Sequence, residues 1–162
     1  MKLCNTEIMK KVKLLEQTKG DILAEERRIH QVTYQTEKDK FDYGYSFAET
    51  RTKIDAIDAE IRKYKRLLNL SNATTMVDEF DMTLGECLVY MAQLNRQIFT
   101  LEEMSKKESI TRRSTINGVI EYTALNYDKA ECQSRLQWVL ETIAKLQVAI
   151  DRTNLTNMIE VD

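Results

Sequence analysis

Proline is absent from the 162-residue sequence, and only four glycines occur in it. Proline breaks helices because it lacks the backbone N–H and its ring clashes with the preceding turn. Its absence over this length therefore favours long, uninterrupted helices. No apolar run approaches the roughly 18 to 20 residues of a membrane-spanning helix, and the N-terminal segment has no apolar core of signal-peptide length. We expect a cytoplasmic protein without a membrane partner.

Histidine and cysteine are also scarce, which bears on metal binding and catalysis. The one histidine is His30, and the three cysteines, Cys4, Cys87 and Cys132, are far apart. Metal sites use closely spaced ligands such as Cys-x-x-Cys, and a nucleophile needs a neighbouring base. No two glycines are close enough to form a phosphate-binding loop. The sequence predicts no metal, no cofactor and no catalytic residue, and it favours a non-enzymatic protein.

Neither sign of charge is in large excess, because 24 basic residues stand against 26 acidic ones for a net charge of −2. A balanced chain has no global attraction for nucleic acid, so no nucleic-acid partner is expected. Hydrophobic residues make up 43% of the chain and recur periodically, which excludes disorder. The length fits a single domain, residues 1–162.

Four segments carry apolar residues at alternating steps of three and four, the spacing of helices that pack on other helices. Steps that average 3.5 residues favour coiled-coil-like crossing at about 20°. In chain order the four stripes are Ile8, Val12, Leu15, Ile22 and Ile29; Phe47, Ile54, Ile57, Ile61, Tyr64 and Leu68; Leu84, Cys87, Met91, Leu94, Ile98 and Leu101; and Cys132, Leu136, Val139, Ile143, Leu146 and Ile150. Lys19 and Glu26 interrupt the first stripe.

Three helix starts resemble capping boxes, in which a short oxygen-bearing side chain stands three residues before a glutamate. The pairs are Ser46 with Glu49, Thr83 with Glu86, and Asp128 with Glu131. Each pair opens one of the later three stripes. The sequence therefore predicts helix starts at these three places.

The connections between the stripes contain β signals. Segments 110–116 and 119–123 flank Asn117-Gly118, which predicts a β-hairpin with a two-residue type I′ turn. Residues 31–36 alternate with period two and are rich in β-formers. We interpret them as a strand whose edge pairs with the hairpin.

A short repeat closes two of the stripes, as Asn-Leu-Ser-Asn at 69–72 and Asn-Leu-Thr-Asn at 154–157. Each half of the chain is then a long helix, a connecting segment and a second helix. Two such α-hairpins packed together make an antiparallel four-helix bundle. We predict a mainly α fold of two long antiparallel helical hairpins, coiled-coil-like, with a small β-hairpin element.

Three short motifs lie in order between residues 54 and 95. They are Ile-Asp-Ala-Glu-Ile-Arg at 57–62, Leu-Asn-Leu-Ser-Asn-Ala-Thr-Thr at 68–75, and Asp-Met-Thr-Leu-Gly-Glu at 81–86. With the runs at 120–123 and 150–156, they resemble the septicolysin-like family of small bacterial proteins. The resemblance implies a helical protein and no particular activity, because the family is mostly uncharacterised.

The basic residues near the predicted hairpin form one candidate ligand site. Arg112 and Arg113 can hold phosphate groups bidentately, and Tyr122 and Trp138 follow them as ring surfaces for stacking. The alternative is a solvated hairpin edge, where charge blocks unwanted strand pairing.

The polar end of the second stripe is the other candidate. Asn69, Asn72 and Thr74 offer hydrogen-bonding groups at one end of a bundle. The alternative is that these residues cap the end of the helix, a common role for asparagine and threonine.

Two functional hypotheses remain open. The first stripe is wider than one bundle covers, so we expect a homo-oligomer, a dimer or higher. The first hypothesis is a non-enzymatic bacterial or phage-type scaffold or interaction protein of the septicolysin-like family that acts through this oligomer. The alternative is a binding protein that sequesters an anionic, nucleotide-like small molecule at a subunit interface.

Overall fold

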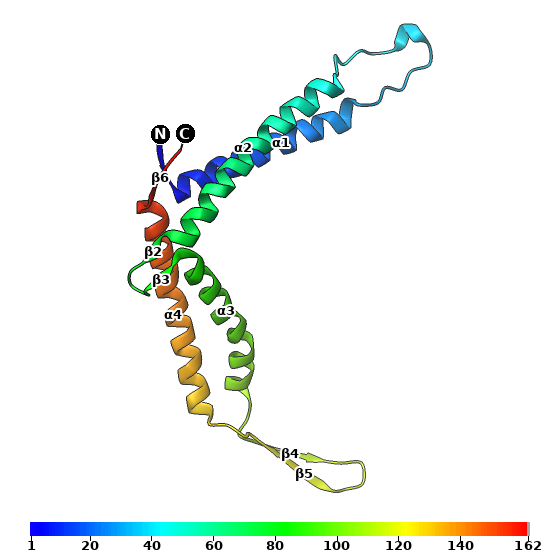
Figure 1. Ribbon diagram of the computed structural model, residues 1–162. Coiled ribbons are helices and arrows are strands. Elements are labelled where there is room, and N and C mark those ends of the chain that lie inside the picture. Colours follow the sequence, from blue (N-terminus) through cyan, green and yellow to red (C-terminus); the bar gives the residue numbers. More distant parts are fainter. Residues whose placement is uncertain (162) are drawn as a thin grey trace. The chain divides into compact units, whose positions relative to one another are not determined.

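The computed structural model describes residues 1–161 and is mainly α (Figure 1). The helices are α1 (Asn5–Ile29), α2 (Phe47–Thr74), α3 (Leu84–Lys106) and α4 (Lys129–Thr156). Three antiparallel strand pairs accompany them: β1 (Lys2–Cys4) with β6 (Met158–Glu160), β2 (Met76–Val77) with β3 (Met82–Thr83), and β4 (Ile110–Ser114) with β5 (Ile120–Ala124). The predicted class, mainly α with small β hairpins, is confirmed.

The chain forms two compact units. Unit 1 contains residues 1–75 and the described residues from 154 onward, and unit 2 contains residues 76–153. Unit 1 is built on α1 and α2, and unit 2 on α3 and most of α4. The helices therefore group two by two, as the two helical hairpins require. The single domain expected from the chain length stays a prediction.

Apolar residues of α1 and α2 face each other in unit 1, and ion pairs fill the gaps in their stripes. Ile8 and Ile54 are buried. Lys19, which interrupts the α1 stripe, places Nζ 2.7 Å from a carboxylate oxygen of Asp58 on α2. Glu26, the second interruption, pairs with Arg51 of α2. These charges meet in one register of the two helices, so they help to fix how the helices align.

The core of unit 2 lies between α3 and α4. Its buried members are Val77, Leu84, Cys87, Leu94, Val139, Leu146, Ala149 and Ile150. These residues come mainly from the third and fourth stripes, where no charged residue interrupts the spacing. Burying one leucine or isoleucine side chain stabilises a fold by roughly 1.5 to 3 kcal/mol, so this row of side chains holds the two helices together.

Each predicted capping residue accepts a backbone N–H at the start of its helix, but of the three predicted boxes the reciprocal pair of bonds is found at Thr83 and Glu86, and one more pair joins them. The Glu86 carboxylate accepts from the Thr83 N–H at 2.7 Å, and Thr83 Oγ1 accepts from the Glu86 N–H at 3.2 Å. Ser46 Oγ accepts from the Glu49 N–H at 3.3 Å. The Asp128 carboxylate accepts from the N–H of Ala130, two residues on, at 2.7 Å.

The additional pair opens α1, where Glu7 accepts from the Cys4 N–H at 2.8 Å. Cysteine is not among the usual capping residues, and for that reason the sequence pattern does not show this helix start. The hydrogen bond lowers the pKa of the Glu7 carboxyl. The same arrangement at Thr83 lowers the pKa of Glu86.

The short repeat extends into the strands that follow it. β2 comes after the first Asn-Leu-Ser-Asn segment and pairs with β3, the start of the second half of the chain. β6 comes after the second segment and pairs with β1, the start of the first half. The end of each half thus pairs with the beginning of the other half.

The predicted strand at residues 31–36 is wrong, because this segment forms an irregular loop ahead of a short 3-10 turn, Glu37–Asp39. Local side-chain hydrogen bonds take the place of a strand ladder. The Tyr34 hydroxyl donates to Glu37 at 3.0 Å, and the Thr36 hydroxyl donates to Asp39 at 2.6 Å. Within residues 1–161, β4 pairs with β5 and with no third strand.

The β4–β5 hairpin is confirmed, but its turn differs from the predicted two-residue type I′ turn. Thr115 N–H donates to Val119 O at 2.8 Å, and Gly118 N–H donates to Thr115 O at 3.0 Å. Gly118 has φ of +74°, and Asn117 keeps a negative φ. These bonds describe a type I turn followed by a left-handed glycine, the usual three-residue hairpin loop. Only one left-handed residue is needed, and glycine provides it.

Candidate functional site

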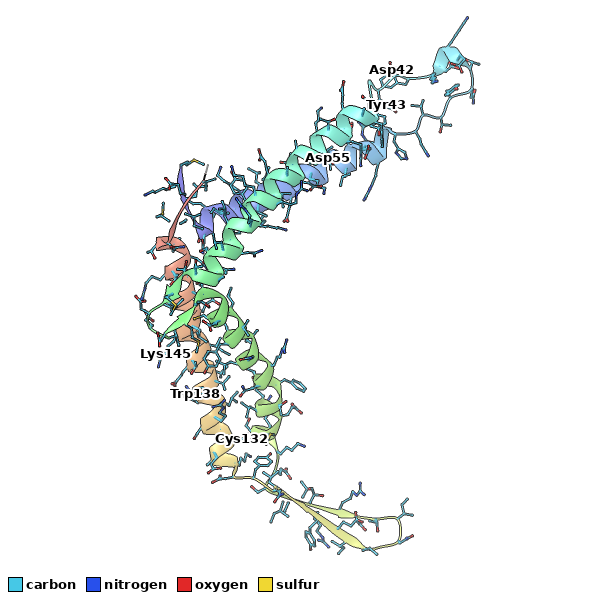
Figure 2. The ribbon with its side chains drawn as sticks, in the orientation of Figure 1. Asp42, Tyr43, Asp55, Cys132, Trp138 and Lys145 are labelled. Atoms are coloured by element: carbon cyan, nitrogen blue, oxygen red, sulfur yellow. The ribbon has the colours of Figure 1, made fainter. Side chains whose placement is uncertain are left out.

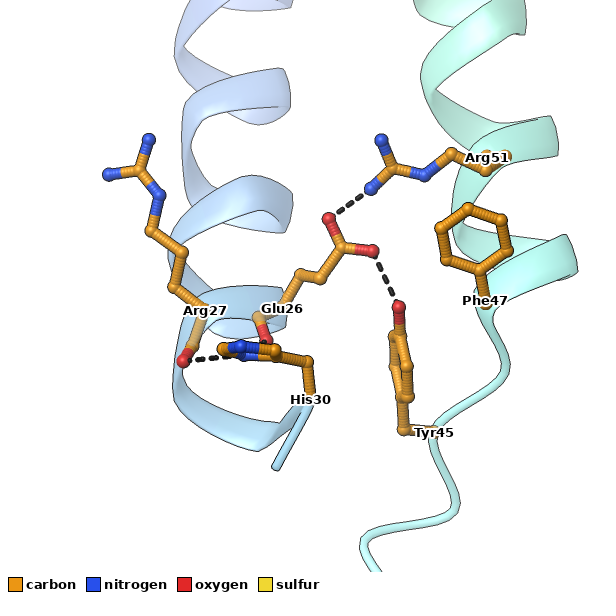
Figure 3. Close-up of a pocket in the computed structure, with 6 residues that line it drawn as sticks. All are labelled: Glu26, Arg27, His30, Tyr45, Phe47 and Arg51. Carbon is orange, nitrogen blue, oxygen red and sulfur yellow. Dashed lines mark hydrogen bonds and ion pairs between the residues drawn. The ribbon is translucent and has the colours of Figure 1, made fainter. Parts of the chain in front are cut away.

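A cavity of about 440 Å³ lies in unit 1, where the loop 30–46 connects α1 to α2 (Figure 3). We call it the loop-end cavity. Its lining residues are Glu26, Arg27, His30, Tyr45, Phe47 and Arg51. Glu26 and Arg27 come from the last turn of α1, His30 caps the end of that helix, and the others come from the loop and the first turns of α2. Two further cavities of about 420 and 370 Å³ also use Tyr45.

Glu26 is the centre of the polar wall of the loop-end cavity. Its carboxylate accepts a hydrogen bond from the Tyr45 hydroxyl at 2.7 Å and pairs with the Arg51 guanidinium through its other oxygen. The hydrogen bond from Tyr45, followed by that from Arg51, lowers the pKa of Glu26. The same bond raises the pKa of Tyr45. Glu26 is therefore a carboxylate at neutral pH, and both of its oxygens are engaged.

His30 ends α1 and turns one ring nitrogen toward the helix. Its Nδ1 lies 2.9 Å from the carbonyl oxygen of Arg27 and 3.1 Å from that of Glu26. A carbonyl oxygen only accepts, so Nδ1 carries the proton. This leaves Nε2 as the nitrogen that a bound molecule can meet. Figure 3 shows the Arg27 side chain pointing away from Tyr45, so Arg27 contributes its backbone carbonyl here.

Arg51 is the second polar group that points into this region. Its Nη2 pairs with Glu26, and its Cζ lies 5.2 Å from the ring centre of Phe47. Its Nε atom is buried and has no hydrogen-bond partner among the described residues. A buried donor without an acceptor costs roughly 1 to 3 kcal/mol. Phe47 itself is 64% exposed, which leaves much of its side chain open to solvent or to a ligand.

The predicted basic site near the hairpin does not converge within one chain. Arg112 lies opposite Tyr122 in the β4–β5 register, and Arg113 lies opposite Glu121. Successive residues of a strand point to opposite faces, so the two arginines do not form one clamp. Arg113 Nη2 is 3.4 Å from a carboxylate oxygen of Glu121.

Trp138 lies on α4 (Figure 2), and its ring faces Arg135, whose Cζ is 4.2 Å from the ring centre. Trp138 is thus already paired with an arginine of its own helix. The ligand role of Arg112, Arg113, Tyr122 and Trp138 stays a prediction.

The two Asn/Thr segments meet within unit 1. Asn157 Nδ2 donates to Ser71 Oγ at 2.9 Å and to Thr75 Oγ1 at 3.1 Å. Asn5 Nδ2 donates to Asn154 Oδ1 at 3.0 Å. Ser71 and Asn5 are both buried.

The predicted ligand residues Asn69, Asn72 and Thr74 lie beside this network. The Thr74 hydroxyl donates to the Leu70 carbonyl of its own helix at 2.9 Å. The hydrogen bonds that join the two segments run from Asn157 to Ser71 and Thr75, whereas Asn154 accepts from Asn5 of α1. A binding role for Asn69, Asn72 and Thr74 stays a prediction.

Sequence reasoning missed Tyr45, Phe47 and Arg51 as a site. One signal was present, since the segment 41–47, which leads into the second stripe, carries four aromatic residues. Glu26 was visible only as a break in an apolar stripe. The meeting of Glu26 with Arg51 depends on the antiparallel packing of α1 and α2, which brings residues 25 positions apart into contact.

Two further findings limit the chemistry of the described residues. Over residues 1–161, no three side chains of His, Cys, Asp or Glu lie together as a metal site would need. A search of the same residues finds no helix with the length and apolar character to cross a membrane.

Comparisons with known proteins show the fold alone. No family model and no curated protein matches the chain. A solved structure of a functionally unknown conserved protein from Corynebacterium diphtheriae is similar, with a TM-score of 0.66. The match covers 99% of this chain and 100% of that chain at 13% sequence identity.

Proposed function

We propose that the protein is a non-enzymatic, homo-oligomeric scaffold in which the β4–β5 hairpin of one copy packs on the hairpin of a second copy. One observation carries the proposal: all ten residues of β4 and β5 are exposed, although one face of the hairpin carries four apolar side chains. Ile110, Ile120, Tyr122 and Ala124 share this face with Arg112 and Ser114. The other face carries Thr111, Arg113, Glu121 and Thr123.

An isolated two-stranded hairpin is marginally stable in water. Ile110 and Tyr122 are each 65% exposed, so the apolar face gains little from burial within one chain. Packing two such faces together removes this surface from water and supports both hairpins. A two-fold arrangement satisfies both copies at once, because each offers the other the same patch.

The helices of unit 2 add a second exposed apolar surface. Val89 and Phe99 on α3, and Leu140 and Val148 on α4, are exposed. On a helix of 3.6 residues per turn, Phe99 and Leu140 lie roughly 100° from the buried stripes of their helices, and Val89 and Val148 lie nearly opposite those stripes. A helix that is apolar on two faces packs on two neighbours. Within one copy, α3 and α4 pack on each other, so the second neighbour of each would come from another copy.

The surface area supports a partner of substantial size. The chain exposes 12044 Å², whereas two separate compact units of about 80 residues each would expose roughly 5000 Å² apiece. A stable dimer buries about 800 Å² from each partner. The excess surface is more than a dimer interface requires.

Light scattering coupled to size-exclusion chromatography tests the proposal. We expect a mass of two or more copies of the 19.0 kDa chain. Tyr122→Asp with Ile120→Asp on the apolar face is expected to give the monomer. The matched control, Thr111→Asp with Thr123→Asp on the polar face, is expected to keep the oligomer. A monomeric wild-type protein, or an oligomer that survives the apolar-face change, refutes the proposal.

The cellular location and family belong to the same proposal. We place the protein in the cytoplasm, and its three free, buried cysteines support this because reducing compartments keep thiols unpaired. The motifs at 57–62, 68–75 and 81–86 support membership in the septicolysin-like family. The alternative function, sequestration of an anionic small molecule, has its best support in the loop-end cavity of unit 1 and not in the basic hairpin.

A further inference from the structure

We propose that the loop-end cavity binds a small organic anion that carries a flat ring, with Arg51 holding the anionic group and Phe47 and Tyr45 holding the ring. This site is independent of the proposed oligomer, because its lining residues all lie in unit 1. The class includes nucleoside monophosphates and aromatic carboxylates, which share the anion and the ring.

The balance of donors and acceptors favours an anion. The oxygens of Glu26 are engaged by Tyr45 and Arg51. The Arg51 Nε–H is buried and has no acceptor among the residues that the structure describes. A guanidinium with an unused N–H offers a charge-assisted hydrogen bond to a carboxylate or phosphate oxygen, and such bonds are about twice as strong as neutral ones. A ligand that brings an acceptor to Nε removes the cost of this unpaired donor.

His30 is placed to assist at the mouth of the same cavity. Because its Nδ1 is bound to backbone carbonyls of the last α1 turn, the ring is fixed and Nε2 is the nitrogen left for a ligand. In this tautomer Nε2 is an acceptor, so it meets a hydroxyl or another donor of the ligand and not its anionic oxygens.

The size and the remaining walls favour a flat ring. A volume of about 440 Å³ lies within the roughly 300 to 1000 Å³ of small-molecule sites, and a bare phosphate ion would leave most of it empty. Phe47 is 64% exposed and borders the cavity with Tyr45. Aromatic side chains pack well against flat rings, and Arg51 beneath Phe47 already orients that ring.

Two-dimensional ¹⁵N NMR of the arginine side chains tests the site, because a buried Nε–H exchanges slowly and gives its own signal. The probes are adenosine monophosphate and benzoate, each containing an anion and a ring, with inorganic phosphate and adenosine as the separate parts. We expect either complete probe to shift the Arg51 Nε–H signal, with a dissociation constant near or below about 1 mM. Each separate part is expected to bind at least about tenfold more weakly.

Three variants connect the binding to the named residues. Arg51→Gln is expected to abolish binding, as measured by calorimetry. Phe47→Ala removes an exposed ring, leaves the ion pair in place and is expected to weaken binding about threefold to tenfold. Arg62→Gln changes an exposed arginine on the same helix and is expected to bind as the wild type does.

Several results would overturn the proposal. The first is an Arg51 signal that neither complete probe moves. The second is a Phe47→Ala variant that binds with unchanged affinity, and this test remains if Arg51→Gln fails to fold. Phosphate alone binding as tightly as adenosine monophosphate would remove the ring from the proposal. Since oligomer formation is measured separately by light scattering, failure here leaves the scaffold proposal standing.

Discussion

Replacing Leu146 by alanine tests whether the α3–α4 core holds unit 2 together. Leu146 is fully buried among Leu84, Cys87 and Leu94. The change removes carbon atoms worth about 0.8 kcal/mol for each buried CH₂ group and leaves a cavity in a closely packed row. Substitutions of this type cost about 2 to 5 kcal/mol. We expect a loss of about 3 kcal/mol in the free energy of unfolding.

The assay is urea unfolding followed by Trp138 fluorescence. Trp138 is the one tryptophan of the chain and lies on α4 (Figure 2), so its signal reports on unit 2. With a denaturant dependence of roughly 1 kcal/mol per molar urea for a unit of this size, the midpoint should fall by about 3 M. Circular dichroism on the same samples follows the helices of both units.

Leu140→Ala is the matched control, because it makes the same change six residues earlier on the same helix at a side chain that is 43% exposed. In dilute protein it should cost about 1 kcal/mol or less. At concentrations that favour the proposed oligomer, its cost should rise because Leu140 belongs to the second apolar surface. Equal midpoint shifts for Leu146→Ala and Leu140→Ala in dilute protein would refute the account of the core.

Two other predictions concern a capping box and a turn. Hydrogen bonds from Thr83 lower the pKa of Glu86, so its contribution to stability is complete above the pKa of the unfolded chain and disappears as pH falls through the lower, folded value. The urea midpoints of wild type and Glu86→Gln should therefore differ at pH 7 and converge as the pH falls below the folded pKa of Glu86; a constant difference contradicts this. Gly118→Ala forces a side chain into φ of +74°, costing about 1 to 2 kcal/mol, and should increase hydrogen exchange at the Thr115 amide without moving the Trp138 midpoint. Gly20→Ala, a control inside α1, should stabilise its helix by about 1 kcal/mol.

Apolar spacing explains why so much of the helical architecture can be predicted. The stripes beginning at Leu84 and Cys132 have no interruption, and both become the buried faces of α3 and α4. The capping pair Thr83 and Glu86 lies three residues apart, so its geometry is local and its sequence pattern is sufficient. The start of α1 was not visible because Cys4 stands where a serine or threonine is usual.

The failed strand at 31–36 shows where local patterns stop being informative. A period of two makes a strand possible, but a strand is stable only with a neighbour that satisfies its backbone hydrogen bonds. Whether such a neighbour is present depends on the tertiary structure. The predicted neighbour was the β4–β5 hairpin, whose two strands pair with each other. In the β4–β5 hairpin, Asn117-Gly118 correctly indicated where the turn lies. The turn type differs from the prediction because the loop has three residues and not two.

The sequence by itself determined the four helices, the buried stripes of α3 and α4 and the β4–β5 hairpin, because these depend on side-chain period and on contacts between near neighbours in the chain. Only the tertiary structure decided that β1 pairs with β6, and that Glu26, Tyr45 and Arg51 surround one cavity. Those contacts join residues up to about 160 positions apart. They form because the packed helices bring distant segments of the chain together, and no local sequence pattern contains that information.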